Sequence, residues 1–241
     1  MTAELIVYAL IAAGLIFWLR SILGTRSDDD PLLAPKLELT EDGKVVGLGG
    51  NAERNSDKIA LIAELAEEAN EKGNMSIENQ QAQDGLVDIV KADRDFDVYV
   101  FLQAAQDAFV FVVESFAEGD RETLEDLLSR DVFAAFDGAI TQRENAGETM
   151  ETEIQSIQKS EIVEARLEGK IAYVTVRFWA DEVSVSKDEE GNIVHGHPDK
   201  SSQMRDVWTF SRDTKSRDPR WMVVETREDG VNDNDIVPNS H

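Results

Sequence analysis

The spacing of the apolar residues changes once along this chain, near Gly147, and this change constrains the fold more than any other feature. Between residues 98 and 147, apolar side chains recur every three or four positions, which predicts three helices. The first should end at Gly119, and Asp120 and then Ser129 or Asp131 should begin the next two. Beyond Gly147 the period becomes two. Helices followed by strands predict the α+β class, with three helices packed on a curved antiparallel sheet.

The clearest strand covers residues 171–180. Its expected core side carries Ala172, Val174, Val176, Phe178 and Ala180. Further strands are predicted at 154–167, with a break near residue 160, at 204–212 and at 221–227. Residues 183–195 have the pattern of a hairpin that turns through residues 188–191. One face of this sheet should therefore pack on the helices.

The N-terminal residues form the longest uninterrupted apolar run. As a helix, residues 3–23 rise about 31 Å, which spans a hydrocarbon core of roughly 30 Å if Arg20 extends to the interface beside Trp18. The side chains expected in the membrane are Leu5, Ile6, Val7, Leu10, Ile11, Leu15, Ile16, Phe17, Trp18 and Leu19. We predict that residues 1–25 are a single transmembrane anchor in contact with membrane lipid.

Two alternatives fit this run less well. A cleaved signal peptide needs a basic start, which Thr2, Ala3 and Glu4 do not provide, and a small-residue cleavage site. A buried helix of a soluble fold usually has polar residues on at least one face. Because Arg20 and Arg26 follow the run and no lysine or arginine precedes it, the positive-inside rule predicts that the N-terminus lies outside and the C-terminal domain is cytoplasmic.

Residues 26–94 have the composition of an acidic flexible tether with one short amphipathic helix at 56–72. That helix could dock on a partner, on a membrane surface or on its own domain, although its glutamates argue against anionic lipid. Leu86, Ile89 and Val90 indicate a second short helix. We place the compact domain at residues 95–230 and a disordered tail at 231–241.

The charge balance and composition exclude several functions. Aspartate and glutamate number 49 against 24 lysines and arginines, and the net charge of −25 repels nucleic acid. There is no cysteine, and three histidines leave few groups for acid–base or metal chemistry. His195 and His197 could share a metal on a strand, but Gly196 and Pro198 indicate a solvated turn. We predict a non-enzymatic protein without cofactor, metal or nucleic-acid partner.

Three stretches of the C-terminal part resemble a known family. They are AFVFVVESFAEGDRETLEDLLSRDVFAAF at residues 108–136, followed by Arg143 and Gly147, then EARLEGKIAYVTVRF at 164–178, and DVWTFSRD with DPRW at 206–213 and 218–221. Over about residues 95–228 they resemble the Tim44-like domain, the C-terminal domain of the mitochondrial presequence-translocase adaptor. The resemblance implies a nuclear-transport-factor-2-like cone with an apolar pocket, and a role as a membrane-associated adaptor.

The chain departs from the mitochondrial adaptor in its hydrophobic anchor, its acidic charge and its lack of an Arg-rich presequence. These features are similar to the bacterial membrane-anchored branch of the family. We therefore expect a single-pass protein of the bacterial inner (cytoplasmic) membrane, whose partners are membrane or membrane-associated proteins.

The candidate pocket combines aromatic side chains with one carboxylate. Its predicted lining is Phe109, Val113, Phe116, Phe136, Phe178, Asp206, Trp208 and Phe210. Large aromatic residues at these periods also fit an ordinary core. Asp206 shares a strand face with Trp208 and Phe210, and a desolvated aspartate there could act as a base. The alternative is a structural ion pair between Asp206 and Arg143 or Arg212.

Two functions follow from this interpretation. The first is a membrane-tethered adaptor or scaffold, whose domain binds protein segments or acyl groups by apolar contact. The second is an accessory subunit of a larger inner-membrane complex, respiratory, photosynthetic or protein-translocating. Minor alternatives are an apolar ligand binder and an enzyme that uses the pocket aspartate. The enzyme requires Asp206 to be buried with no arginine within hydrogen-bonding reach.

Overall fold

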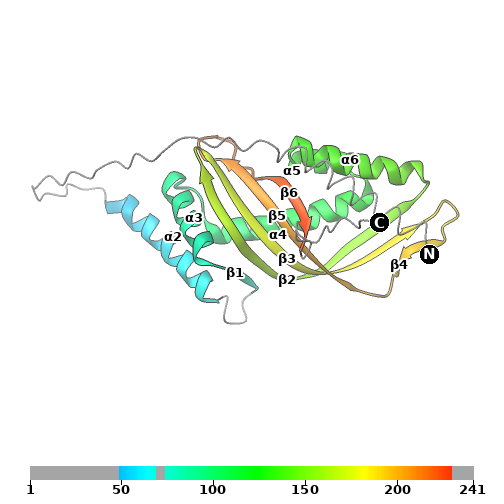
Figure 1. The fold of residues 1–241 in the computed structure, drawn as a ribbon, viewed down its shortest axis with the longest axis horizontal. Helices are drawn as coiled ribbons and strands as arrows, with labels where there is room; N and C mark the ends of the chain where they lie inside the picture. The colour runs from blue at the N-terminus through cyan, green and yellow to red at the C-terminus, as the bar shows by residue number, and fades with distance from the viewer. Residues whose placement is uncertain (1–48, 69–73, 230–241) are drawn as a thin grey trace, which may run out of the picture. The chain divides into compact units, whose positions relative to one another are not determined.

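The computed structural model describes residues 49–68 and 74–229, and the predicted anchor and tail lie outside them. A curved mixed sheet runs through the described part (Figure 1), in the order β1-β2-β3-β5-β6 with β4 added to β3. Its strands are β1 (Met75–Ile77), β2 (Thr149–Glu168), β3 (Ile171–Lys187), β4 (Ile193–Gly196), β5 (Ser202–Asp213) and β6 (Met222–Glu228). The α+β class is confirmed, but β1 pairs in parallel with β2, so the sheet is not purely antiparallel.

Three of the helices begin or end at the predicted capping residues, whereas the helix predicted at residues 56–72 begins earlier, at Gly49. The helices are α2 (Gly49–Glu68), α3 (Gln80–Ala92), α4 (Val98–Glu118), α5 (Arg121–Leu127) and α6 (Arg130–Asn145). Gly119 ends α4 in the left-handed region, at φ 76°. The side chains of Asp120 and Ser129 accept backbone N–H bonds that cap α5 and α6.

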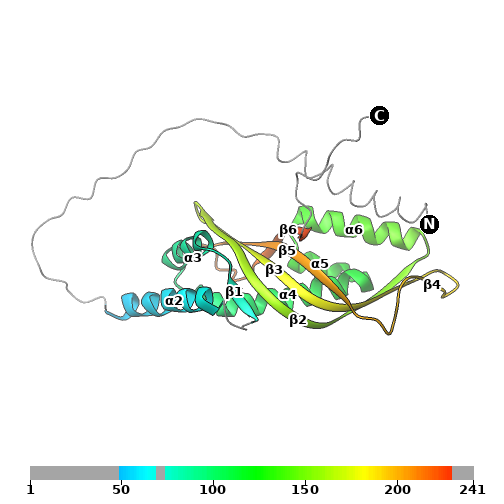
Figure 2. The same ribbon diagram turned by 60° about the horizontal axis from the view of Figure 1, so that its bottom comes forward.

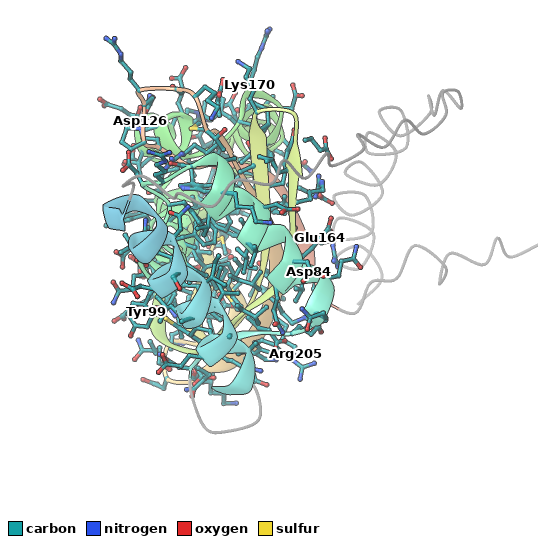
Figure 3. The ribbon with its side chains drawn as sticks, turned by 90° about the vertical axis from the view of Figure 1, so that its left-hand side faces the viewer. Asp84, Tyr99, Asp126, Glu164, Lys170 and Arg205 are labelled. Carbon is teal, nitrogen blue, oxygen red and sulfur yellow. The ribbon has the colours of Figure 1, made fainter. Side chains whose placement is uncertain are left out.

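The core lies between the helices and one face of the sheet. The five residues expected on the core side of β3, from Ala172 to Ala180, are all fully buried, which confirms the period-two prediction. α4 runs along the sheet beside α5 and α6 (Figures 1 and 2). Two hydrogen bonds fix the position of α4 along β2: Gln106 Nε2 donates to Ser160 Oγ over 2.9 Å, and Glu114 Oε1 accepts from the Ile154 amide over 3.2 Å. Charged side chains such as Asp84, Glu164 and Lys170 lie at the periphery (Figure 3).

By length and composition, α4 is the one helix in the described part that could cross a membrane. Its residues Phe101, Leu102, Phe109 and Val112 are buried in the core, so it is the core helix of this unit. The long β2 also differs from the prediction. No break occurs near Ser160, and bulges between residues 154 and 164 bend the strand while it stays paired with β3.

The packed unit begins earlier than the predicted boundary at residue 95. β1 is fully buried and pairs with β2, and α3 approaches β2 so closely that a Cβ at Gly85 would lie 1.9 Å from the Ala165 carbonyl oxygen. α2 buries Ile62 and Leu65, and its Lys58 Nζ donates to the carbonyls of Arg94 and Phe96 over 2.6 and 2.7 Å. The amphipathic helix therefore docks on its own domain. A three-residue strand is too short to show a period, which is why the sequence placed this region in the tether.

Candidate functional site

Four of the predicted pocket residues form a closed aromatic core. Phe109, Phe178, Trp208 and Phe210 are at most 2% exposed. The Phe109 ring stacks on Phe178 at 4.6 Å between centroids and lies 4.9 Å from Trp208. Rings packed this tightly leave these four side chains as ordinary core.

The other predicted apolar residues lie farther along α4 and α6 and are only half-buried. Phe116 meets Phe136 edge-on at 5.2 Å between centroids. Further half-buried side chains continue across the same face of the sheet, because Ile157 pairs with Ala180 and Ala180 pairs with Met204. We call this surface the distal patch, which consists of Val113, Phe116, Phe133, Phe136, Ile154, Ile157 and Met204. It is the candidate binding surface.

Arg143 holds α6 against the end of α4 beside this patch. Its Nη2 donates to the carbonyls of Phe116 and Ala117 over 2.8 and 2.9 Å, which satisfies two carbonyls at the end of α4. Its guanidinium lies 5.1 Å from the centre of the Phe116 ring. Burial lowers the pKa of Arg143. The hydrogen-bond partners of Arg143 are therefore backbone carbonyls and not Asp206.

Asp206 faces the core side of β5, between the closed core and the distal patch. It pairs with Phe178 on β3 and with Glu228 on β6, and the Trp208 indole donates to its Oδ2 over 3.3 Å. Burial raises the pKa of Asp206 to about 6, and the charges of Glu228 and Glu182 add to this effect against the Trp208 hydrogen bond. The carboxyl group is therefore partly protonated near pH 6.

Arg212, the other predicted partner of Asp206, pairs instead with Asp93 at the end of α3. Burial lowers the pKa of Arg212. The predicted ion pair between Asp206 and an arginine is therefore wrong for both candidates. Sequence reasoning missed Asp93 because it lies in the segment assigned to the tether. Asp93 follows shortly after the apolar positions Leu86, Ile89 and Val90, which indicates the end of a helix. This pattern does not indicate a partner far along the chain.

A second apolar surface, on the outer side of α4, was also missed. Val100 and Phe111 are 62% and 56% exposed, and Tyr99 is 44% exposed. The helical period assigned the inner positions correctly but gave no reason to expect aromatic side chains facing water. His195 and His197 lie in an exposed segment, and residues 49–68 and 74–229 contain no group of three potential metal ligands.

The comparisons with known proteins agree with the sequence resemblance. A family model, the Tim44-like domain, matches residues 82–228. The mitochondrial import inner membrane translocase subunit TIM44 of Mus musculus is 26% identical over 143 residues, which are 58% of this chain and 32% of the mouse protein. A probable homologue of that subunit from Caenorhabditis elegans, tin-44, is 22% identical over 144 residues, 58% of this chain and 34% of the nematode protein. The chain thus spans about a third of the length of these curated relatives.

Among solved structures, the intermembrane space region of the chloroplast protein ARC6 aligns over 53% of this chain and 95% of that chain. Its TM-score is 0.37 and its sequence identity is 12%. The family match extends from α3 to β6 and so covers more than half of the sequence. On that evidence the chain belongs to the Tim44-like domain family.

Proposed function

We propose that this protein is a membrane-tethered, non-enzymatic adaptor whose Tim44-like domain binds apolar segments of partner proteins at the distal patch. The observation that carries the proposal is the half-buried apolar surface between α4, α6 and the sheet, in a domain whose relatives are named as subunits of a mitochondrial inner-membrane translocase. Apolar surface that lies together and still reaches solvent is typical of interaction sites. Within the described residues, Asp206 accepts a hydrogen bond from Trp208 and has two acidic neighbours, Glu182 and Glu228, but it forms no ion pair with a cation, so binding fits the geometry better than catalysis.

The finer parts of the proposal extend the sequence predictions. Residues 1–25 would cross the inner membrane of a bacterium once with the N-terminus outside, and the domain would face the cytoplasm as a nuclear-transport-factor-2-like cone. Since α2 packs on the domain, the proposed tether would be shorter than residues 26–94 and would end before α2. The domain would then work close to the membrane surface.

The alternative, an accessory subunit of a larger inner-membrane complex, gains support from the same observation. A short tether and an ordered segment from α2 to α3 suit a fixed partner better than a search over a wide radius. The two proposals differ in stoichiometry. An adaptor meets several clients in turn, whereas a subunit stays with one complex.

The deciding experiment is extraction of native membranes in mild detergent, affinity capture of the full chain, and mass spectrometry after a high-salt wash. A defined complex in fixed stoichiometry would establish the subunit. Varied, substoichiometric partners would establish the adaptor. A matched capture with Phe116→Ser and Phe136→Ser in the distal patch should lose those partners, whereas Glu125→Gln on the exposed side of α5 should keep them.

A further inference from the structure

The strand register places Asp206 in an apolar wall. Its side chain lies on the same face as Trp208 and Phe178, both of which are buried. Met204, two residues before it on β5, belongs to the distal patch. The carboxyl group is therefore next to the proposed docking surface, and its charge affects what that surface can bind.

The charged groups that act on Asp206 are themselves acidic. They are Glu182 from β3 and Glu228 from β6, and burial raises the pKa of Glu182 as well. At this level α4 presents the uncharged Phe109, which contacts Trp208. On α6, Arg143 is engaged with the end of α4. No cation in the described part forms an ion pair with Asp206, and the side chain that donates a hydrogen bond to it is the neutral Trp208 indole.

Two other well-buried carboxylates of the domain are treated differently. Asp93 pairs with Arg212, and Glu161 pairs with both Lys159 and Arg177. These pairs keep a buried carboxylate ionised because a cation compensates for its lost hydration. At Asp206 the fold supplies like charges and no cation. The ionised state there depends on the water that still reaches this end of the domain.

We infer that the distal patch is a proton-gated docking surface, which takes an uncharged apolar segment of a partner protein when Asp206 is neutral and releases it when Asp206 ionises. A docked segment would exclude water from the carboxyl group. Removal of water from an ionised carboxylate has a large free-energy cost, whereas removal from the neutral form costs much less. Three acidic side chains disfavour an acyl chain with an anionic head group, so the occupant is a protein segment. This inference rests on the proposed function, because it concerns the same surface.

The test is calorimetric titration of the full chain in lipid nanodiscs, with empty nanodiscs as the blank. The probe is an acetylated and amidated peptide of leucine, phenylalanine and serine, which has no ionisable group of its own. With a pKa of about 6 for Asp206, and binding only to the neutral form, the affinity should fall about thirtyfold between pH 5 and pH 7.5. Laurate serves as the acyl probe; its carboxylate is anionic at pH 7.5, where it should bind more weakly than the peptide.

Variants separate gating from structure. Asp206→Asn should bind the peptide at pH 7.5 nearly as tightly as the unmodified chain does at pH 5, and the dependence on pH that remains should be small and belong to Glu182. Glu228→Gln removes one repulsive charge, so the midpoint of the dependence should move to lower pH. The control, Glu125→Gln, should leave the profile unchanged.

Each outcome decides between the claims. Equal affinity at both pH values in the unmodified chain, or an unchanged profile in Asp206→Asn, overturns the gating but leaves the docking surface in place. Tighter binding of laurate than of the peptide at pH 7.5 overturns the choice of occupant. If the peptide binds at neither pH 5 nor pH 7.5, the docking surface itself is overturned, and the proposed function with it.

Discussion

The two ends of the same sheet face solve the burial of polar groups in opposite ways. At one end, which we call the proximal cluster, Phe96, Phe101, Phe210 and Trp221 pack ring against ring at 4.7 to 5.9 Å between centroids, and Arg212 pairs with Asp93 below them. At the other end, the rings of the distal patch are half-buried and Asp206 has only acidic charges beside it. One helix, α4, contributes side chains to both ends. This difference fits the proposal that the proximal cluster provides stability and the distal patch binds partner segments.

The largest expected effect contrasts a core ring with a patch ring. Phe178→Ala should lower the free energy of unfolding by about 3–5 kcal/mol, because it leaves a cavity among fully buried rings. Phe136→Ala should cost about 1–2 kcal/mol, since its side chain is already partly in water. Urea denaturation followed by circular dichroism measures both. Equal losses would mean that the distal patch is core and not a binding surface.

The next effect concerns the ion pair of the proximal cluster. Asp93→Asn leaves Arg212 buried without its counter-charge and should lower the free energy of unfolding by about 3 kcal/mol. The matched control is Lys170→Gln, which breaks the pair between Lys170, in the turn before β3, and Asp213 at the end of β5, and should cost less than about 1 kcal/mol. If both substitutions cost the same, the Asp93–Arg212 pair contributes no more than a surface pair.

The sequence predicts some features of the two ends of the sheet and misses others. The core side of β3 and the caps at Gly119, Asp120 and Ser129 were predicted correctly, since one-sided burial and helix ends depend on local pattern. The partners of the arginines were not, because Arg212 meets a residue 119 positions away and Arg143 meets backbone carbonyls. Pairing over such separations is set by the packed fold and leaves no local period. The choice of pocket residues remains a prediction, and the structure separates them into core rings and patch.

A smaller effect tests whether α2 belongs to the proximal end of the domain. Lys58→Ala removes the two hydrogen bonds to the carbonyls of Arg94 and Phe96 and should cost about 1 kcal/mol, because the site is partly exposed. Hydrogen exchange should speed up in α2 while β3 keeps its protection. Lys200→Ala, in an exposed turn, is the control. Unchanged exchange in α2 would show that Ile62 and Leu65 hold the helix without the lysine.

The smallest effect has the opposite sign and belongs to the distal end. Burial and like charges raise the pKa of Asp206 from its ordinary value of 3.8 to about 6, so the ionised form is less favourable in the folded state than in the unfolded chain. This contribution is most stabilising below pH 3.8, and it is lost as pH rises through 6. Asp206→Asn should therefore raise the free energy of unfolding at pH 7.5 by about 1 kcal/mol, a figure reduced for the water that still reaches the group. At pH 4 the variant and the unmodified chain should have nearly equal free energies of unfolding.

The stability contribution of Glu161 has the reverse dependence on pH, because Lys159 and Arg177 lower its pKa. The informative quantity is therefore the difference in free energy of unfolding between the two proteins at each pH. A variant less stable than the unmodified chain at pH 7.5 would show that the Asp206 carboxylate stabilises the fold, and that the two ends are built alike.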